Sequence, residues 1–351
     1  MRGGEKVLEA LLELYPEADI LTLVHVRGSV SPAIERHRIR ASWLSRVPGI
    51  ARIYRACLPL FPIAIEQFDT DDYDLIVSTS HCAAKAIVPA RGRHLCYCLT
   101  PMRYAWDQFD AYFGPARVGR AGSMLLRPVM AGLARWDRAT AGRANRYVAI
   151  SQYVARRIGR YYNRDASVVY PPVDTAFYTP DGAHPDRYFL IVSALVPYKR
   201  LEVAIEAVAR AGMTLKLVGT GPDETRLRTL AASCGASVEF LGRRSDEELR
   251  HLYRHARALL FPGEEDFGIV PVEAQACGRP VIAFARGGAR ETVIDGVTGI
   301  LVDDTSVDAF VDAIDASLTK TFDTRAIRKQ AERFGRERFL DDIATEISLL
   351  E

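Results

Sequence analysis

The second half of the chain alternates short apolar runs with amphipathic helical patterns, and this alternation limits the fold more than any other feature of the 351 residues. Apolar strands that alternate with helices predict a parallel sheet covered by helices on both faces. The expected strands are Tyr188–Ala194, Thr214–Val218, Ser237–Leu241, Ala258–Phe261, Pro280–Phe284 and Gly299–Val302. The expected helices between them include Leu201–Ala211, Glu224–Ser233 and Asp246–Arg257.

The first half repeats this pattern less clearly. Its expected strands are Ile20–Val24, Leu75–Ser78, His94–Cys98 and Tyr147–Ile150. Its expected helices are Glu5–Tyr15, Ser80–Val88, Arg117–Arg143 and Ser151–Tyr161. Another α/β domain is therefore predicted in the N-terminal half of the chain.

A proline-rich segment separates the two halves. Four prolines lie between Tyr170 and Pro185, and prolines at this density continue neither a helix nor a central strand. We expect an N-terminal domain at 1–170, a linker at 171–186, a C-terminal domain at 187–330, and a C-terminal helix at 331–351 that packs back across a cleft. The predicted fold class is α/β, with two doubly wound Rossmann-like domains that face this cleft. Ligands of such sheets bind outside the carboxyl ends of the strands.

Charge and composition narrow the partners and the location. The net charge is +2, but residues 1–170 carry +9 and residues 171–351 carry −7. A basic half suits phosphates, anionic lipid or nucleic acid, although no nucleic-acid-binding motif is present, so we expect no nucleic-acid partner. No apolar run reaches the roughly 20 residues of a spanning helix, which makes a cytoplasmic location the default. The six cysteines form no CxxC pair and lie at no metal-ligand spacing from a histidine, so buried, reduced thiols and no metal are expected.

The segment from Phe261 to Gly278 carries the strongest chemical signal. A strand is expected to end at Phe261, a glycine-bearing loop follows, and a helix is expected to begin near Ile269. The first N–H groups of this helix are then available to phosphate or sugar oxygens. Glu265 precedes this helix and Glu273 lies inside it, and eight helical residues would span about 12 Å. This reach suits a ligand with hydroxyls at both ends and a diphosphate between them. The alternative is an acidic loop followed by one exposed helical glutamate.

The whole block resembles the family-4 retaining glycosyltransferases of the GT-B fold. The run from Glu265 to Glu273 carries the Glu-x7-Glu spacing, and Gly287-Gly288, Glu291-Thr-Val293 and Gly296-x-x-Gly299 downstream are similar to the family as well. The resemblance implies that Glu265 lies at the donor sugar hydroxyls and that Glu273 holds the ribose hydroxyls. It also places Phe267, Gly268, Ile269 and Val270 at the donor.

The resemblance continues upstream of this block. The segment Val192-Ser193 to Arg200 looks like the one that carries the basic pair at the diphosphate, with Lys199 on the family lysine. Ala194 stands where the family usually has arginine, and we expect Arg200 to replace it because a guanidinium forks well onto phosphate. A solvated helix start is the alternative for this pair. The remaining donor-side positions that the resemblance implies are Gly219, Gly221, Gly242 and Arg243.

In the first half, the run from Tyr97 to Asp107 resembles a subgroup that acts in O-antigen and exopolysaccharide assembly, many of whose members are mannosyltransferases that use GDP-mannose. Leu99 replaces the histidine of that motif, so no imidazole can serve the leaving phosphate there. The expected acceptor or cleft residues are Arg103, Trp106, Asp107 and His81. The alternative for Arg103, Trp106 and Asp107 is a packed loop with Trp106 in the core. The alternative for His81 is a structural histidine.

The start of the chain resembles the family glycine loop, here Gly3 and Gly4, and the helix after it. The strand that normally precedes this loop is missing from the sequence, and we expect the natural start to lie upstream or the chain to be a truncated form.

The function that the resemblance implies is the transfer of a hexose, with GDP-mannose as the expected donor, to a lipid-linked oligosaccharide or similar polyprenyl-linked glycan. No cofactor is expected beside the nucleotide sugar. A peripheral contact with the inner face of the cell membrane is expected from the basic first half and from Arg46, Arg52 and Arg55 beside the apolar stretch Cys57–Ile65. An ordinary buried helix is the alternative for that stretch. Two other functions stay open: a nucleotide-sugar epimerase or hydrolase on the same fold, and a catalytically silent nucleotide-sugar-binding protein.

Overall fold

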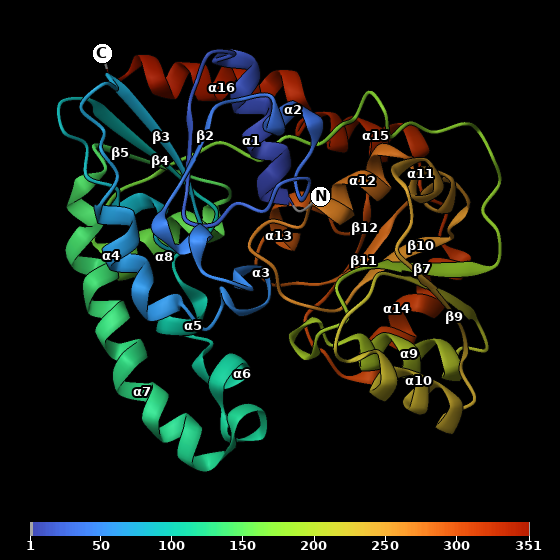
Figure 1. The fold of residues 1–351 in the computed structure, drawn as a ribbon. Coiled ribbons are helices and arrows are strands. Elements are labelled where there is room, and N and C mark those ends of the chain that lie inside the picture. The colour runs from blue at the N-terminus through green and yellow to red at the C-terminus, as the bar shows by residue number, and fades with distance from the viewer. Residues whose placement is uncertain (1–2, 351) are drawn as a thin grey trace. The chain divides into compact units, whose positions relative to one another are not determined.

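The computed structural model describes residues 3–350, and the chain divides into two compact units (Figure 1). The first unit comprises residues up to Pro172 together with the segment from Phe339 onward, and the second unit is Val173–Arg338. The division falls inside the proline-rich segment. Residues 173–186, which the sequence assigns to a linker, are part of the second unit.

The second unit contains the predicted parallel sheet. Its six strands lie in the order β12 (Gly299–Val302), β11 (Val281–Phe284), β10 (Ala258–Phe261), β7 (Tyr188–Val192), β8 (Thr214–Val218) and β9 (Ser237–Gly242). All neighbouring pairs are parallel. The chain builds outward from β7 to one edge and then returns to build outward from β10 to the other. This reversal between β7 and β10 is the topological switch point of a doubly wound sheet, beside which ligands bind.

Helices cover both faces of this sheet (Figure 1). One layer contains α9 (Leu201–Arg210), α10 (Glu224–Ser233) and α14 (Val307–Thr319), and the other contains α11 (Asp246–His255), α12 (Ile269–Ala276) and α15 (Thr324–Glu332). The core beneath the first layer joins strand residues such as Leu215 and Leu260 to helix residues such as Ala204 and Phe310, all buried. Short α13 (Ala289–Thr292) and η5 (Pro197–Lys199) complete the unit.

The first unit is built on a parallel four-stranded sheet in the order β3 (Leu75–Ser80), β4 (Arg93–Cys98), β5 (Arg146–Ala149) and β6 (Ser167–Val168). A second sheet pairs β1 (Ile20–Thr22) with β2 (Ile39–Ala41). Helix α1 (Gly3–Leu14) packs on β3, and α8 (Gln152–Tyr162) packs on β5 and β6. The other elements are α2 (Pro32–Glu35), η1 (Trp43–Arg46), α3 (Ile50–Ile53), η2 (Leu58–Leu60), α4 (Phe61–Glu66), η3 (Ala84–Ala86), α5 (Arg103–Trp106), α6 (Phe109–Phe113), α7 (Pro115–Ala139) and η4 (Thr140–Arg143).

The helix predicted at Ser80–Val88 is wrong. Strand β3 continues to Ser80, and only the 3-10 turn η3 follows. The side chain of Ser80 accepts a hydrogen bond from the Lys85 backbone N–H (3.2 Å), which holds the turn. Pro89 disfavours a helical conformation at Val88 and ends any continuation. The short strands β2 and β6 were not predicted, because three and two residues are too few to show a periodic pattern.

The end of the chain belongs to the first unit. Helix α16 (Arg336–Ser348) begins in the second unit, and from Phe339 onward its residues are part of the first. The Phe339 ring packs edge-on against Tyr97 of β4, with ring centroids 5.6 Å apart. Glu346 forms an ion pair with Arg146 and accepts a hydrogen bond from Ser167 (2.7 Å).

Among residues 3–350, no helix has the length and apolar character to cross a membrane. The six cysteines form no disulfide. Met1 and Arg2, at the start of the predicted glycine loop, lie outside the described residues, and the expectation of a strand upstream of Gly3 stays a prediction.

Candidate functional site

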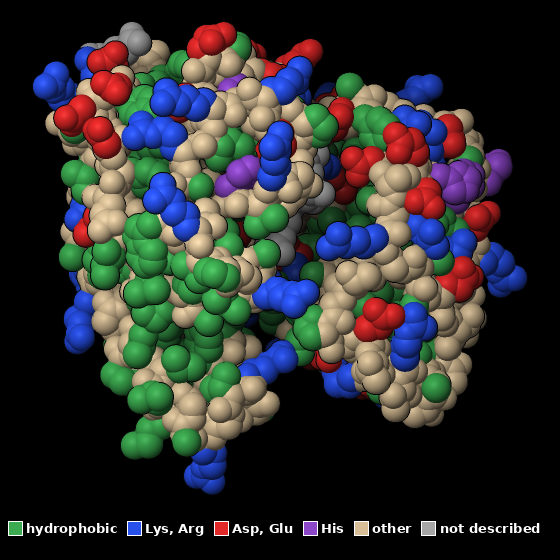
Figure 2. Space-filling model, viewed as in Figure 1, with side chains coloured by type: hydrophobic (Ala, Val, Ile, Leu, Met, Phe, Trp, Pro, Cys, Tyr) green, Lys and Arg blue, Asp and Glu red, His purple; other side chains and the backbone are tan. Residues whose placement is uncertain are grey.

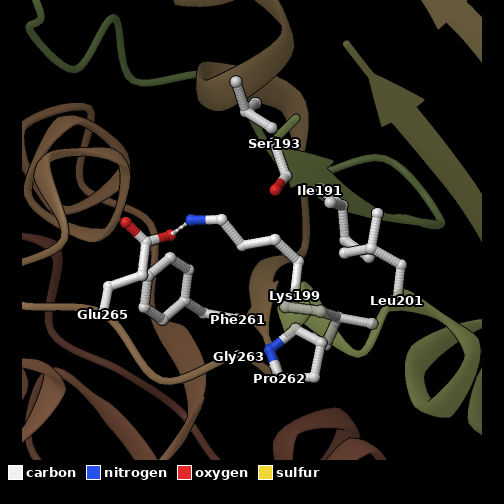
Figure 3. Close-up of a pocket in the computed structure, with 10 residues that line it drawn as sticks. Ile191, Ser193, Lys199, Leu201, Phe261, Pro262, Gly263 and Glu265 are labelled. Atoms are coloured by element: carbon white, nitrogen blue, oxygen red, sulfur yellow. Dashed lines mark hydrogen bonds and ion pairs between the residues drawn. The ribbon is translucent and has the colours of Figure 1, made fainter. Parts of the chain in front are cut away.

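The candidate site lies where β7 and β10 end, at the switch point of the second unit. The chain leaves β7 at Val192 and passes through Ser193 to Lys199, and it leaves β10 at Phe261 and passes through Gly263 to Glu265. Neighbouring parallel strands end at the same edge, so these two loops meet. They enclose a small hollow lined by Ile191, Val192, Ser193, Lys199, Leu201, Leu260, Phe261, Pro262, Gly263 and Glu265 (Figure 3).

An ion pair between Lys199 and Glu265 crosses this hollow. Figure 3 shows the lysine side chain extended to the carboxylate from the opposite loop, with the two groups in direct contact. The side chains are 13% and 28% exposed, so both charged ends remain within reach of a ligand. The structure therefore brings together two residues that lie 66 positions apart and that the sequence assigned to the diphosphate and to the sugar.

Glycines set the path of the Glu265 loop. A Cβ at Gly287 would lie 2.0 Å from the carbonyl oxygen of Glu265, and one at Gly288 would lie 2.3 Å from Cα of Phe267. The Gly288 N–H donates to the Glu265 carbonyl (2.8 Å). Only glycine allows this approach, so the Gly287-Gly288 pair holds the backbone that carries the carboxylate.

The loop after β8 supports Ser193 in the same way. A Cβ at Gly219 would lie 1.8 Å from the Ser193 carbonyl oxygen, and one at Gly221 would lie 2.2 Å from that of Leu195. Gly219 also has φ +129°, which disfavours other residues. The two predicted glycines therefore determine the conformation of the neighbouring loop from Ser193 to Leu195.

The predicted helix at Ile269 is present as α12, with Gly268 at its N-cap in a left-handed conformation (φ +89°). Ile269 and Val270 form its first turn. Phe267 is buried and packs against the ring of Phe334, with centroids 5.4 Å apart, which anchors the loop before the helix.

Glu273 is a buried carboxylate inside α12 and not the exposed helical residue of the alternative interpretation. Its side chain accepts a hydrogen bond from the Tyr253 hydroxyl (2.9 Å), and the residue is 5% exposed. Burial and the nearby Glu273 charge raise the pKa of Tyr253 well above its usual value. The phenol therefore remains protonated and holds the carboxylate in one orientation. No sequence pattern indicates Tyr253, because only the folded chain brings α11 beside α12.

The structure does not bring Arg200 to the Lys199–Glu265 pair. Arg200 is exposed, has a left-handed backbone (φ 52°) at the N-cap of α9, and donates to the Thr305 hydroxyl. It does not line the hollow beside Lys199. Gly242 (φ +67°) and the exposed Arg243 lie at the end of β9, an edge strand that is separated from β7 by β8.

In the first unit, Trp106 and Asp107 are held by an extensive network. The Trp106 indole donates to Asp137 (2.8 Å) and stacks on Tyr161, with centroids 4.7 Å apart. Asp107 pairs with Arg157 and accepts from the Tyr161 hydroxyl (3.1 Å). Neighbours in the first unit thus hold both side chains, but Trp106 is half-buried and Asp107 is exposed, and their role at the acceptor stays a prediction.

Asp137 itself lies in a buried ion pair that sequence analysis missed. Lys85 Nζ is 3.0 Å from its carboxylate, and both side chains are at most 1% exposed. The Tyr162 hydroxyl also donates to Asp137 (2.9 Å). Neither charged residue belongs to a recognisable motif, and 52 positions of the chain separate them.

The other predicted first-unit residues occupy separate positions. His81 is exposed directly after β3, and Arg103 begins the short helix α5. Gly3 and Gly4 begin α1, and a Cβ at Gly4 would lie 3.1 Å from the Leu99 side chain. Leu99, in place of a histidine, thus packs beside the first glycine-bearing turn. Residues 3–350 contain no group of three or more His, Cys, Asp or Glu side chains with the geometry to hold a metal.

Comparison with known proteins supports the family that the second unit resembles. Residues 180–337 match the family model of the glycosyl transferases group 1. An uncharacterized glycosyltransferase of Methanocaldococcus jannaschii is 31% identical over 162 residues, which cover 46% of each chain. A D-inositol 3-phosphate glycosyltransferase of Mycobacterium sp. is 35% identical over 199 residues, covering 50% of this chain and 45% of the relative. The chain thus spans about half the length of the curated relatives it matches.

Solved structures match the chain over nearly its whole length. HepE of Anabaena, in complex with UDP and glucose, matches with a TM-score of 0.73 and 21% identity over 99% of this chain and 96% of its own. Sucrose-phosphate synthase of Thermosynechococcus elongatus matches with a TM-score of 0.71 and 22% identity over 98% and 90%. These likenesses show the fold. Residues 180–337 are thus similar to the glycosyl transferases group 1, and the chain has the GT-B fold of these solved structures.

Proposed function

We propose that this protein is a retaining glycosyltransferase that moves a hexose from a nucleoside-diphosphate sugar to a glycan acceptor. The observation that carries the proposal is the contact of Lys199 with Glu265 at the switch point of the second unit. A lysine suits a diphosphate and a carboxylate suits sugar hydroxyls. When a donor enters, its phosphate replaces Glu265 as the partner of Lys199, and Glu265 is released to orient the sugar.

The proposed chemistry is a substitution on the face from which the nucleotide leaves. The bond between the anomeric carbon and the phosphate oxygen breaks, and a bond from that carbon to the acceptor oxygen forms on the same face. The acceptor proton passes to an oxygen of the departing β-phosphate. Lys199 neutralises charge that develops on the leaving group, and positioning supplies the remainder of the rate enhancement.

The proposed donor is GDP-mannose, on the resemblance of the segment from Tyr97 to Asp107, and the proposed acceptor is a polyprenyl-linked oligosaccharide of surface polysaccharide synthesis. The structural neighbour HepE binds UDP and glucose, which makes UDP-glucose the main competing donor to test. A panel of GDP-, UDP- and ADP-sugars in a thermal-shift assay distinguishes them, because a ligand that binds the folded state raises its melting temperature.

Substitution of Lys199 tests the site itself. We expect Lys199→Ala to lower kcat/KM for transfer by about 10²–10³-fold, the usual loss when one charge-stabilising group is removed. Lys329→Ala, an exposed lysine of α15, is the matched control. Arg200→Ala measures whether Arg200 also serves the diphosphate, as the sequence predicted. Equal kcat/KM in Lys199→Ala and wild type would reject the proposed site.

Transfer is expected to continue after EDTA treatment, because Lys199 and not a metal ion is proposed to neutralise the leaving diphosphate. Turnover that stops with EDTA and returns with Mg²⁺ or Mn²⁺ would contradict this. Product analysis without acceptor separates the other functions: an isomerised or hydrolysed nucleotide sugar would indicate an epimerase or hydrolase, and binding without turnover a silent binding protein.

A further inference from the structure

Helix α7 of the first unit exposes an unusually apolar outer face. Its inner face is buried through Ser123, Met130, Leu133 and Asp137, which recur at helical spacing. Met124 and Leu125 point away from that face and are 78% and 72% exposed, the highest values among the large hydrophobic side chains of the described chain. Two adjacent side chains with so little cover do not contribute to the core of the unit.

The first unit exposes further apolar side chains on α7 and on other elements. Elements η2 and α4 pack against α7 through Leu58 and Phe61, which contact the cluster of Met130 and Leu133. Leu60 of η2 (39%) and Ile63 of α4 (53%) are exposed. Ile53 of α3 (44%), Tyr112 of α6 (36%) and Val118 of α7 (39%) are exposed as well. Figure 2 shows hydrophobic side chains gathered over α4 and α7. We call these five residues with Met124 and Leu125 the apolar patch.

The apolar patch includes part of the stretch that the sequence analysis left open between a membrane contact and a buried helix. Leu58 and Ile65 of Cys57–Ile65 are buried, and Leu60 and Ile63 are exposed. The stretch therefore fills the core with one face and leaves the other face to solvent.

The charges around the apolar patch are mainly positive. Residues 109–128 contain Arg117, Arg120 and Arg127 but only one acidic residue, Asp110. Arg117 and Arg120 are exposed, and Arg127 is 60% exposed and pairs with Asp110 (3.0 Å). Arg52 of α3 and Arg55, which follows this helix, are exposed as well. Apolar side chains bordered by arginines are the combination that interfacial membrane-binding surfaces use.

We propose that the apolar patch inserts into the headgroup boundary of an anionic lipid bilayer, with Met124 and Leu125 as the deepest anchors and Arg117 and Arg120 at the lipid phosphates. A second copy of the chain fits this face poorly, because a symmetric contact would bring arginines against arginines. The inference rests on the exposed side chains and does not require the proposed transfer reaction.

Vesicle co-sedimentation at low salt tests the anchors. Wild type is expected to bind vesicles of equal parts phosphatidylcholine and phosphatidylglycerol, and to bind pure phosphatidylcholine far more weakly. Met124→Asp/Leu125→Asp should lower the partition coefficient at least about tenfold, since a methylene group in the apolar boundary is itself worth severalfold. The matched control is Ile294→Asp/Val297→Asp, which changes two exposed apolar residues of the second unit (42% and 46% exposed) and should bind as wild type does.

The arginines are tested separately. Arg117→Gln/Arg120→Gln should lower the partition coefficient on anionic vesicles about fivefold per charge removed. Arg210→Gln/Arg228→Gln, on the second unit, should lower it little. Circular dichroism and the melting temperature establish that each variant folds. The thermal shift with a donor nucleotide is measured on the same variants, so that a failure of vesicle binding is distinguishable from a failure of the proposed function.

Three outcomes would overturn the proposal. The first is wild-type protein that stays in the supernatant with anionic vesicles at low salt. The second is equal loss of binding in the anchor variant and in its second-unit control. The third is self-association in sedimentation velocity that the anchor variant abolishes while vesicle binding is unchanged, which would assign the face to a second copy.

Discussion

At the scale of single residues, the two glutamates of the Glu265–Glu273 block occupy different environments. Glu265 is 28% exposed and contacts Lys199, whereas Glu273 is 5% exposed and contacts Tyr253. The Tyr253 hydroxyl donates a hydrogen bond to Glu273, so it positions this side chain without being part of the motif.

Removal of this hydroxyl tests its positioning role. We expect Tyr253→Phe to weaken nucleotide binding about tenfold and to reduce the preference for ribose over 2′-deoxyribose nucleotides, because a reoriented Glu273 would no longer meet the ribose hydroxyls that it is proposed to bind. The loss of one hydrogen bond to a charged group is worth about 1.5–3 kcal/mol. Isothermal titration with GDP and 2′-deoxy-GDP, or with the UDP pair if UDP-sugars prove to bind, measures both effects.

Tyr188→Phe is the control, since the Tyr188 hydroxyl donates to the Leu252 carbonyl of the same helix α11 (2.8 Å) but does not contact Glu273. A similar loss of ribose preference in both variants would show that Tyr253 acts only through the stability of α11.

His94 gives the first unit a pH-dependent stability. Burial lowers its pKa from 6.5 to about 4. Its ring lies 2.8 Å from the Ser78 hydroxyl and 3.2 Å from the Arg143 carbonyl. The carbonyl can only accept, so Nδ1 carries the proton and Nε2 accepts from Ser78. The folded ring is therefore neutral where the unfolded ring is already protonated.

The contribution of the neutral His94 ring to the free energy of unfolding is fully present above pH 6.5. It declines by up to about 3 kcal/mol as the pH falls toward 4. Urea unfolding of the wild type and of His94→Gln at pH 7 and pH 5 measures this. The wild type should lose more of its unfolding free energy than the variant between these pH values. Equal losses in the two proteins would exclude His94 as the source.

At the scale of elements, the loops after the strands of the second unit depend on glycines for close approach and not only for turning. Gly219 and Gly212 both have positive φ (129° and 63°). A Cβ at Gly219 would meet the Ser193 carbonyl oxygen at 1.8 Å, whereas one at Gly212 would meet nothing within 4 Å. The two positions separate the effect of backbone strain from the effect of steric contact.

We expect Gly219→Ala to displace the Ser193 loop and to weaken donor binding at least about tenfold. Gly212→Ala should cost only the strain of a left-handed residue, about 1–2 kcal/mol of stability, with donor affinity unchanged. Thermal melting and nucleotide titration of both variants provide the comparison. Wild-type affinity in Gly219→Ala would mean that this loop does not determine the site.

At the scale of the whole molecule, the last segment of the chain completes the unit that the chain began with. Phe339, Ile343 and Ile347 are at most 6% exposed and belong to the first unit. We expect Phe339→Ala to destabilise this unit by about 3–5 kcal/mol, the usual cost of such a truncation in a core. Hydrogen exchange should therefore accelerate in β4 and β5 and remain unchanged in β8 and β10.

Leu349→Ala, at a residue that is 61% exposed, is the control for a change near the same terminus. Faster exchange in β8 and β10 alone would place the energetic contribution of α16 in the second unit.

The sequence by itself determined the parallel sheet of the second unit, the helix at Ile269 and the loop motif around Glu265, because these depend on local periodicity and on residues close together in the chain. It did not determine the Lys199–Glu265 contact, the Tyr253 donor to Glu273 or the Lys85–Asp137 pair. Each joins elements that are distant in sequence, and only their packing brings the charges together. The contact of Arg200 with Thr305 likewise depends on packing, and the role of Arg200 at the diphosphate stays a prediction.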